Sequence, residues 1–352
     1  MINTLGLAAA RRRAAAWGLG LSVVLAATFI VGVGAGPVSV PAEASLAIIA
    51  HHLFGAPLGA DLALHDAIIW EIRLPRIVLG GLVGAGLALS GAVLQTLVRN
   101  LLADPFVLGV NSGASTGAAL AILFGLGAGF GDYALQGSAF VGALAASLLL
   151  YAVARSQGRL TSIRLLMAGV AIGYALSAVT SFLIFASDSA ESSRSVMFWL
   201  LGSLGLARWD GPLAVVAVVV ALSTAVLMLV SRNLDALSVG DDTALTAGVN
   251  PERFRAFMLV VVCLLVGAIV PMAGSISFVG LVVPHLARRF VGGSHRVVIP
   301  ISAPMGAILL IWADIGARTL LAPRELSIGI ITALVGAPFL LILVRRMHAS
   351  AG

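Results

Sequence analysis

Five side chains that could bind a metal ion lie close together near the start of the chain. They all fall within residues 37–72 and are His51, His52, Asp61, His65 and Asp66. Imidazole and carboxylate groups are common zinc ligands, but zinc sites use characteristic ligand spacings. The spacing here fits none of them, so solvated loop residues are the better interpretation. We assign no metal site to this segment.

The chain contains no lysine, because all 21 basic residues are arginine. A Walker A phosphate loop places a lysine on the nucleotide phosphates. The chain therefore cannot hydrolyse ATP by that route, and any ATPase must be a partner protein. The single cysteine, Cys263, lies inside an apolar run and can form no intrachain disulfide. We expect no bound cofactor.

The composition places these residues in a membrane. Hydrophobic residues make up 60% of the 352 residues, charged residues make up 10%, and the mean hydropathy is +1.09. Backbone groups in hydrocarbon must be paired within the protein, so only helices or closed barrels can span it. The apolar runs are long and lack the alternation of barrel strands. The fold class predicted is an all-α polytopic membrane protein.

About twenty apolar residues in a helix cross a bilayer, and the sequence contains about ten runs near this length. They are residues 17–35, 77–98, the run after Pro105, 133–154, 165–186, 212–231, 254–270, 276–291, 297–320 and 327–344. A cleaved signal peptide is the alternative for the first run, because Ala42-Glu43-Ala44 resembles a cleavage site. That run is longer than the apolar region of a signal peptide, which is usually roughly 7–15 residues, so a retained span is favoured.

Two function classes that need ionisable groups inside the membrane are disfavoured. An ion-coupled secondary transporter carries buried ionisable side chains near the middle of its spans. The apolar runs of this chain contain almost none. An intramembrane enzyme would need an acid, a base and a nucleophile at one depth, and no such set is present. The chain is therefore not predicted to be an enzyme.

Arginines mark the two sides of the membrane when the runs alternate in direction. One side receives Arg11–Arg13, Arg99, Arg155, Arg159, Arg164, Arg232, Arg253, Arg255, Arg288, Arg289, Arg296, Arg345 and Arg346. The other side receives Arg73, Arg76, Arg194, Arg208, Arg318 and Arg324. The arginine-rich side is cytoplasmic, which places both termini in the cytoplasm. The net charge of +6 thus reflects topology and not a nucleic-acid partner.

Two segments on the outer side leave the membrane, residues 37–72 and 187–211. In the first, Pro41 and Gly55 bracket a short amphipathic helix. Its apolar face is predicted to be formed by Leu46, Ile49 and Leu53. In the second, residues 196–201 form an apolar core that is too short to cross, which predicts a re-entrant or surface helix.

The inner segment 232–252 is the longest cytoplasmic connection. Asp241 and Asp242 stand where a helix N-terminus favours negative charge, and Gly248 stands where that helix would end. A helix of about eight residues is not stable alone, so it must dock against the membrane domain or another protein. A solvated turn is the alternative. The apolar positions available for docking are Val239, Ala244, Leu245 and Val249.

Residues 73–117 predict a helical hairpin in lipid. Within each arm glycines stand four residues apart, at Gly80, Gly84, Gly109, Gly113 and Gly117. Such a ladder lets helix backbones approach closely where lipid gives no hydrophobic reason to associate.

Near the outer end of a later run, Asp314 and Arg318 also stand four apart, which predicts an ion pair on one helix face.

The hairpin also carries a dense series of motifs. They are Arg73-Leu-Pro-Arg76, Ser90-Gly91-Ala92-Val93-Leu94-Gln95, Arg99-Asn100, Ala103-Asp104-Pro105, Leu108-Gly109-Val110 and Ser112-Gly113-Ala114. Later motifs are Arg164-Leu-Leu-Met-Ala-Gly169, Trp199-Leu-Leu-Gly202-Ser203, Val239-Gly240-Asp241-Asp242-Thr243-Ala244, Phe278-Val-Gly-Leu-Val-Val-Pro-His285 and Glu325-Leu326-Ser327-Ile328-Gly329. In this order the chain resembles the permease subunits of bacterial ABC importers for iron chelates and vitamin B12. The resemblance implies a type II ABC importer permease fold of ten transmembrane helices, with residues 1–352 as one permease domain that pairs with a second copy.

The resemblance also implies roles for particular residues. The inner segment would form coupling helices in a groove of the ATPase, through Gly240, Asp241, Asp242, Ala244 and Gly248. Acidic residues of a periplasmic binding protein would meet Arg73, Arg76 and Arg318, and such pairs steer docking. The inner gate would lie near Thr161 and Ser162. Further candidates for the pathway are Met167, Ser177 and Met197, although hydroxyls such as Ser177 also serve helix packing.

The sequence thus predicts the permease subunit of an importer that carries an iron chelate across the bacterial inner membrane. Haem is favoured over a ferric siderophore because the candidate lining is apolar, with Met167, Met197 and Met272 and few charges. Vitamin B12 is the alternative substrate. The expected partners are a second copy of the chain, two ABC ATPase subunits, a periplasmic substrate-binding protein and membrane lipid.

Overall fold

The computed structural model describes residues 4–36, 40–59, 62–106, 108–155 and 160–349, and the regular structure in these ranges is helical. The first half contains α1 (Thr4–Gly34), α2 (Ala42–Phe54), α3 (Ala63–Ala67), the π-helical segment η2 (Ile68–Arg73), α4 (Leu74–Leu97), α5 (Val110–Phe124), the 3₁₀ segment η3 (Ala128–Tyr133), α6 (Ala134–Arg155) and α7 (Ser162–Phe185). The second half contains α8 (Ala190–Leu200), α9 (Gly211–Leu229), α10 (Ser231–Val239), α11 (Asp241–Thr246), α12 (Pro251–Ala273), α13 (Val279–Val291), α14 (His295–Thr319) and α15 (Ile328–Ala349).

Each predicted apolar run overlaps a helix, which confirms the predicted all-helical fold. The runs correspond in order to α1, α4, α5, α6, α7, α9, α12, α13, α14 and α15. Among the described residues, 7 helices are long and apolar enough to cross a membrane by themselves. Helix α5 has 15 residues and α13 has 13, and 15 residues rise only about 22 Å against a core of roughly 30 Å. The count of ten spans therefore stays a prediction.

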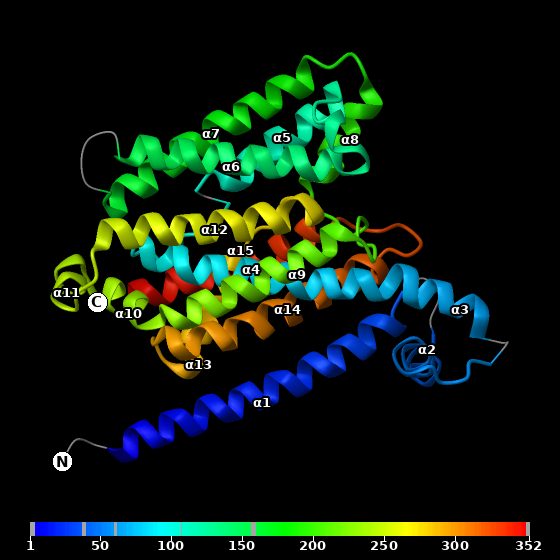
Figure 1. Ribbon diagram of the computed structural model, residues 1–352, viewed down its shortest axis with the longest axis horizontal. Helices are drawn as coiled ribbons and strands as arrows, with labels where there is room; N and C mark the ends of the chain where they lie inside the picture. Colours follow the sequence, from blue (N-terminus) through cyan, green and yellow to red (C-terminus); the bar gives the residue numbers. More distant parts are fainter. Residues whose placement is uncertain (1–3, 37–39, 60–61, 107, 156–159, 350–352) are drawn as a thin grey trace.

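Helix α4 lies in the middle of the bundle, where it contacts α9, α12, α13 and α14 (Figure 1). Nearly all of its residues are buried. Two glycines allow the close contacts. A Cβ atom on Gly84 would overlap the carbonyl of Gly306 in α14, and one on Gly91 would overlap the carbonyl of Gly280 in α13. The packing role predicted for Gly84 is confirmed. Gly91, which was not part of the predicted ladder, allows a second close crossing of the same kind.

The second arm of the hairpin packs in the same way. A Cβ atom on Gly113 would overlap the carbonyl of Gly142 in α6, and one on Gly117 would overlap that of Ser138. Helices α5 and α6 are consequently in contact along their length. Together with α7 and α8 they form one side of the bundle, while α1 lies along the opposite side (Figure 1).

Both ends of the chain lie at the same end of the bundle as α10 and α11, and α2 and α3 lie at the opposite end (Figure 1). We call the first the inner end and the second the outer end, after the sides predicted from the arginines. This arrangement agrees with the predicted alternation of the runs. It also places residues 232–252 beside the two termini, as expected.

The outer segment contains the predicted helix, but with a different buried face. Helix α2 begins after Pro41 and ends at Gly55, which has φ 70°. The buried residues are Ser45 and Ile48, whereas Leu46 and Leu53 are exposed, so the predicted face is wrong. Burial selects Ile48 because that side chain packs into an apolar cluster with Ile69 and Ile77.

The histidines of the outer segment take part in polar and aromatic contacts. His52 Nε2 lies 2.8 Å from Asp66 Oδ1, and its ring stacks on Trp70 at 4.0 Å between centroids. Trp70 in turn lies beside Trp209. Asp61 lies outside the described residues.

In the second outer segment the predicted short helix is present as α8, and it begins earlier than expected because Ser189 caps its N-terminus.

Replacing Gly91 by Ala tests the close crossing of α4 and α13. The added methyl group must separate two backbones, and overpacking of this kind costs about 1–3 kcal/mol. Because the overlap is with backbone atoms of Gly280, we expect the upper part of this range, which exceeds the helix propensity of about 1 kcal/mol gained from Gly to Ala. We expect a lower midpoint when loss of monodisperse protein is followed by size-exclusion chromatography after heating. Gly18→Ala, where a Cβ atom meets nothing within 4 Å, is the control, and equal stability of both variants would contradict the crossing.

Candidate functional site

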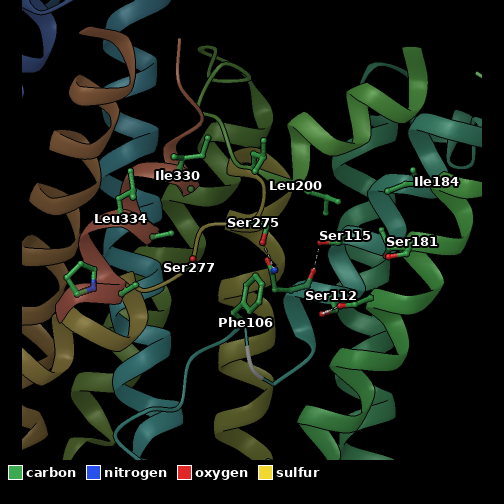
Figure 2. A pocket seen from close by; sticks show the side chains of 18 of the residues that line it. Phe106, Ser112, Ser115, Ser181, Ile184, Leu200, Ser275, Ser277, Ile330 and Leu334 are labelled. Carbon is green, nitrogen blue, oxygen red and sulfur yellow. Dashed lines mark hydrogen bonds between the residues drawn. The ribbon is translucent and has the colours of Figure 1, made fainter. Parts of the chain in front are cut away.

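A cavity of about 860 Å³ opens between α15 on one side and α5 and α7 on the other (Figure 2). Its α5 and α7 wall is polar but uncharged. Its polar side chains are those of Asn111, Ser112, Ser115, Ser177, Thr180 and Ser181, and Ile184 is its apolar member. Ser275 and Ser277, in the connection between α12 and α13, add two more hydroxyl groups between the walls.

The α15 wall of the cavity is apolar. It is formed mainly by Ile330, Ala333, Leu334, Ala337, Pro338 and Leu341. Phe106, which precedes α5, lies across one end (Figure 2). The described lining thus has one hydroxyl-rich wall, one apolar wall and no charged side chain. Such a surface can form neutral hydrogen bonds and apolar contacts, but it offers no strong metal ligand.

The position of the polar wall follows from how α5 begins. Gly109 has φ 79°, which favours glycine, and an added Cβ atom would lie only 3.1 Å from Gly173 N and 3.2 Å from Gly169 O in α7. This close approach brings the first turns of α5 beside α7. Ser112 Oγ then lies 3.4 Å from Ser177 Oγ, and Asn111 Nδ2 donates to Ser275 Oγ at 2.7 Å.

Only one of the three predicted pathway residues lines this cavity. Ser177 does, whereas Met167 and Met197 are exposed on α7 and α8 and are not part of the lining. Met272 is buried in the core. The methionines therefore do not make the cavity apolar, since its apolar wall comes from α15. Whether Met167 and Met197 contact a passing substrate stays a prediction.

At the inner end, Asp241 is held by two arginines. Arg255 donates to both of its carboxylate oxygens, at 2.6 and 3.0 Å, and Arg99 lies at 3.1 Å. Arg255 is 1% exposed and also donates to the carbonyls of Leu97 and Leu160. One buried guanidinium thus joins α11 to the end of α4 and to the residues before α7.

The ion pair fixes the charge of Asp241 at neutral pH. The hydrogen bonds from Arg255 hold the pKa of Asp241 below its usual value, with further lowering by the nearby Arg99. A lowered carboxylate pKa contributes stability above the usual pKa. That stability is lost only as the pH falls through the lowered pKa, so the anchor persists under neutral and mildly acidic conditions.

The other predicted coupling residues surround this anchor. The inner segment forms two helices, α10 and α11, with Gly240 between them in an extended conformation. Ala244 is fully buried, Asp242 is exposed in the first turn of α11, and Gly248 has φ 79° after its end. Two apolar side chains predicted for docking are exposed, Val239 and Leu245. They form a surface at the inner end that a partner protein could cover.

The predicted gate residues lie in the same region. Ser162 Oγ donates to the carbonyl of Leu97 at 2.8 Å and accepts from Arg255 Nη2 at 3.1 Å. Thr161 precedes the first turn of α7, and its hydroxyl is buried with no hydrogen-bond partner among the described residues. Ser162 therefore joins the start of α7 to the end of α4. The gate itself stays a prediction.

A second polar anchor, which the sequence did not reveal, holds α10. Asp235 Oδ1 lies 2.6 Å from Nδ1 of His295, which is buried at the start of α14, and His295 Nε2 lies 2.7 Å from Thr96 Oγ1 in α4. Burial alone would raise the pKa of Asp235, but hydrogen bonds from His295 and Ser294 hold it below its usual value. Both inner helices are thus bound to the carboxyl end of α4.

The three predicted docking arginines lie at the outer end, where all are buried. Arg76 Nε lies 2.8 Å from Asp314 Oδ1, and Arg76 Nη1 lies 3.0 Å from Glu325. Arg318 Nε lies 2.9 Å from Asp314 Oδ2, which confirms the pair predicted from spacing. Arg73 donates to the carbonyl of Val33 at the end of α1, where a helix favours cations.

These contacts give the three arginines a structural role that spacing alone did not indicate. Arg76 connects α4 with α14 through Asp314. Arg318 connects α14 with the end of α1, and Arg73 connects the residue before α4 with the end of α1. Of the paired carboxylates, Glu325 has a half-exposed side chain and Asp314 is buried. A role of the arginines in docking a binding protein stays a prediction.

Comparisons with known proteins agree with this geometry. A model of the FecCD transport family matches residues 24–346. The cobalamin import system permease protein BtuC of Halobacterium salinarum is 39% identical, over 97% of this chain and 99% of that protein. The hemin transport system permease protein HmuU of Yersinia pestis is 42% identical, over 82% of this chain and 87% of that protein.

A solved structure has the same fold. It is described as an inward-facing conformation of a metal-chelate type ABC transporter, and it superimposes with a TM-score of 0.80 at 33% identity. The match covers 94% of this chain and 98% of that chain. Together with the family match over most of the sequence, this shows that the chain belongs to the FecCD transport family of ABC importer permeases.

Proposed function

We propose that this chain is the transmembrane permease subunit of an ATP-driven importer that passes a large metal chelate across the bacterial inner membrane. The observation that carries the proposal is the uncharged cavity between α15 and the pair α5 and α7. Its hydroxyl wall can replace part of the hydration of a polar substrate, and its apolar wall can cover a macrocycle. The absence of strong ligands in the described lining suits a chelate that keeps its metal.

The cavity also bears on the choice of chelate. Haem carries two carboxylates, and an ionised carboxylate away from water needs a cationic or hydrogen-bonding partner. The described lining supplies no cation. A corrinoid such as vitamin B12 is neutral overall, because the positive charge of its cobalt corrin balances its one phosphodiester. Its other polar groups are mainly amides, which serine hydroxyls can both donate to and accept from. We therefore favour a corrinoid over haem, although the sequence alone favoured haem.

The energy for transport comes from a partner in this proposal. ATP hydrolysis in ABC importers is performed by separate ATPase subunits, and the inner helices α10 and α11 are the contact. Asp241 and Asp235 fix these helices to α4, α12 and α14. The exposed Val239 and Leu245 remain available to an ATPase groove. A movement of the groove would then displace helices that are bound directly to the membrane bundle.

The remaining partners follow from the same assignment. A second copy would complete the pathway by covering the open side of the cavity. Two ATPase subunits would bind the inner end, and a periplasmic substrate-binding protein would bind the outer end near Arg73, Arg76 and Arg318. This orientation places both termini in the cytoplasm, as the arginine distribution predicts.

Uptake by reconstituted vesicles tests the proposed function. The chain is reconstituted with its ATPase and binding protein, and labelled cobalamin and haem are supplied separately outside. We expect cobalamin uptake that requires ATP, stops with vanadate and continues with an uncoupler. Uptake of haem alone would contradict the choice of substrate. Uptake that resists vanadate and collapses with an uncoupler would contradict the importer itself.

Substitution of Gly248 tests the coupling role of the inner helices. A Cβ atom at this position meets no atom within 4 Å, but φ is 79°, and a β-branched residue in that conformation costs about 1–3 kcal/mol. We expect Gly248→Val to distort the end of α11 and to lower the substrate imported per ATP hydrolysed by several-fold. Gly248→Asn is the control, because Asn tolerates this conformation. Equal transport by both variants would remove Gly248 from the coupling site.

Removing the charge of Glu325 tests docking at the outer arginines without breaking the buried pair of Arg76 with Asp314. Glu325→Gln leaves more positive charge at this end, and surface charge mainly changes association rates. We expect the binding protein to associate about two- to fivefold faster at low salt, with the difference falling as salt is added. Glu191→Gln, which removes an exposed carboxylate in the first turn of α8, is the control. An equal effect of both variants would mean that the arginines do not form the docking site.

A further inference from the structure

A groove of about 390 Å³ lies between α6 and α12, and it shares no lining residue with the cavity. On α6 it follows a four-residue spacing through Phe140, Leu144 and Leu148, positions that share one helix face. On α12 it follows Phe257, Val260 and Leu264. Most of these side chains are about half exposed, so the groove is open to the surroundings of the bundle.

The body of the groove offers little to a polar ligand. Its polar side chains are Ser147, Cys263 and Tyr151. Ser147 Oγ donates to the carbonyl of Ala143 in its own helix, so its hydrogen is already used. The Tyr151 hydroxyl accepts from Arg155 Nη1 at 2.8 Å. The groove is therefore apolar along its length and becomes polar only where Tyr151 meets Arg155.

The polar end of the groove is cationic. Arg155 ends α6 with a side chain that is 58% exposed, and its guanidinium lies over the Tyr151 ring. Arg253, also exposed, stands four residues before Phe257 in α12, and residues four apart lie on one helix face. Arg155 also lies 3.6 Å from Glu252, so the three charges at this end sum to one positive charge.

The length of the groove matches one leaflet of a bilayer. From Phe140 to Tyr151 the helix rises about 16 Å, roughly half of the 30 Å hydrocarbon core. Phe140 closes the outer end, where it packs so closely on Gly267 that a Cβ atom there would lie 3.1 Å from its ring. The cationic end lies at the inner end of the bundle, because α6 ends and α12 begins there (Figure 1).

We propose that this groove binds an anionic glycerophospholipid of the inner leaflet, with one acyl chain between α6 and α12 and the phosphate beside Arg155 and Arg253. Basic residues at the end of an apolar groove between helices supply both parts of such a site. A second copy of the chain fits this groove less well, because a two-fold axis along the membrane normal would bring the same arginines of both copies together at equal depth, where their charges repel. The inference rests on the membrane location of the bundle and not on the substrate.

Retention of bound phospholipid after extraction tests the proposal. The full chain is reconstituted in equal parts of phosphatidylcholine and phosphatidylglycerol, extracted in mild detergent, and examined by native mass spectrometry. We expect one phosphatidylglycerol to be retained in preference to phosphatidylcholine. Removing both positive charges in the double variant Arg155→Gln with Arg253→Gln is expected to lower the retention of phosphatidylglycerol at least threefold. The matched control, Arg232→Gln with Arg296→Gln, removes two exposed arginines of the inner end that belong to α10 and α14, neither of which lines the groove.

A second pair of variants tests the apolar part separately. Val260→Trp fills the groove from α12 and should also lower phosphatidylglycerol retention at least threefold. Val215→Trp makes the same change at a position of α9 with similar exposure and should leave retention unchanged. Equal retention of both lipids by the unaltered chain would overturn the proposal. So would equal losses in the test and control variants, which would indicate general attraction of acidic lipid to the inner end.

Discussion

The bundle depends on how closely other helices can approach α4. In lipid no hydrophobic force draws helices together, so association relies on dispersion contacts between closely packed backbones and on polar contacts. Gly84 and Gly91 permit backbone contact with Gly306 of α14 and Gly280 of α13. Because dispersion falls steeply with distance, even a small gap would forfeit much of this attraction. The central position of α4 follows from these two crossings.

The same helix connects the two polar ends of the molecule. Arg76 lies in the first turn of α4 and pairs with Asp314 and Glu325. At the other end, the carbonyl of Leu97 accepts from Arg255 and Ser162. The 24 residues of α4 span about 36 Å, the full thickness of the hydrocarbon core. Contacts therefore run without a flexible loop from α11, through Arg255 and α4, to the outer ion pairs.

The cavity shows why charge is kept at the ends of the bundle. Its lining contains hydroxyl, amide and apolar groups, each of which contributes only a modest net interaction. A pathway needs binding that is strong enough to admit a substrate and weak enough to release it. Buried charged groups at the two ends form ion pairs, as in Arg318 with Asp314 and Arg255 with Asp241. The uncharged cavity and the paired ends are consistent with a transport role for the bundle.

The sequence alone determined the features that depend on local periodicity. Apolar length located the helices, glycines four apart located close crossings, and the spacing of Asp314 and Arg318 predicted their pair. Contacts between distant segments required the tertiary structure, including Arg255 with Asp241, Arg76 with Asp314 and His295 with Asp235. The buried face of α2 was also mispredicted, because Ile48 is selected by an apolar cluster built from other helices. Local spacing fixes which residues share a helix face, but only packing decides what each face meets.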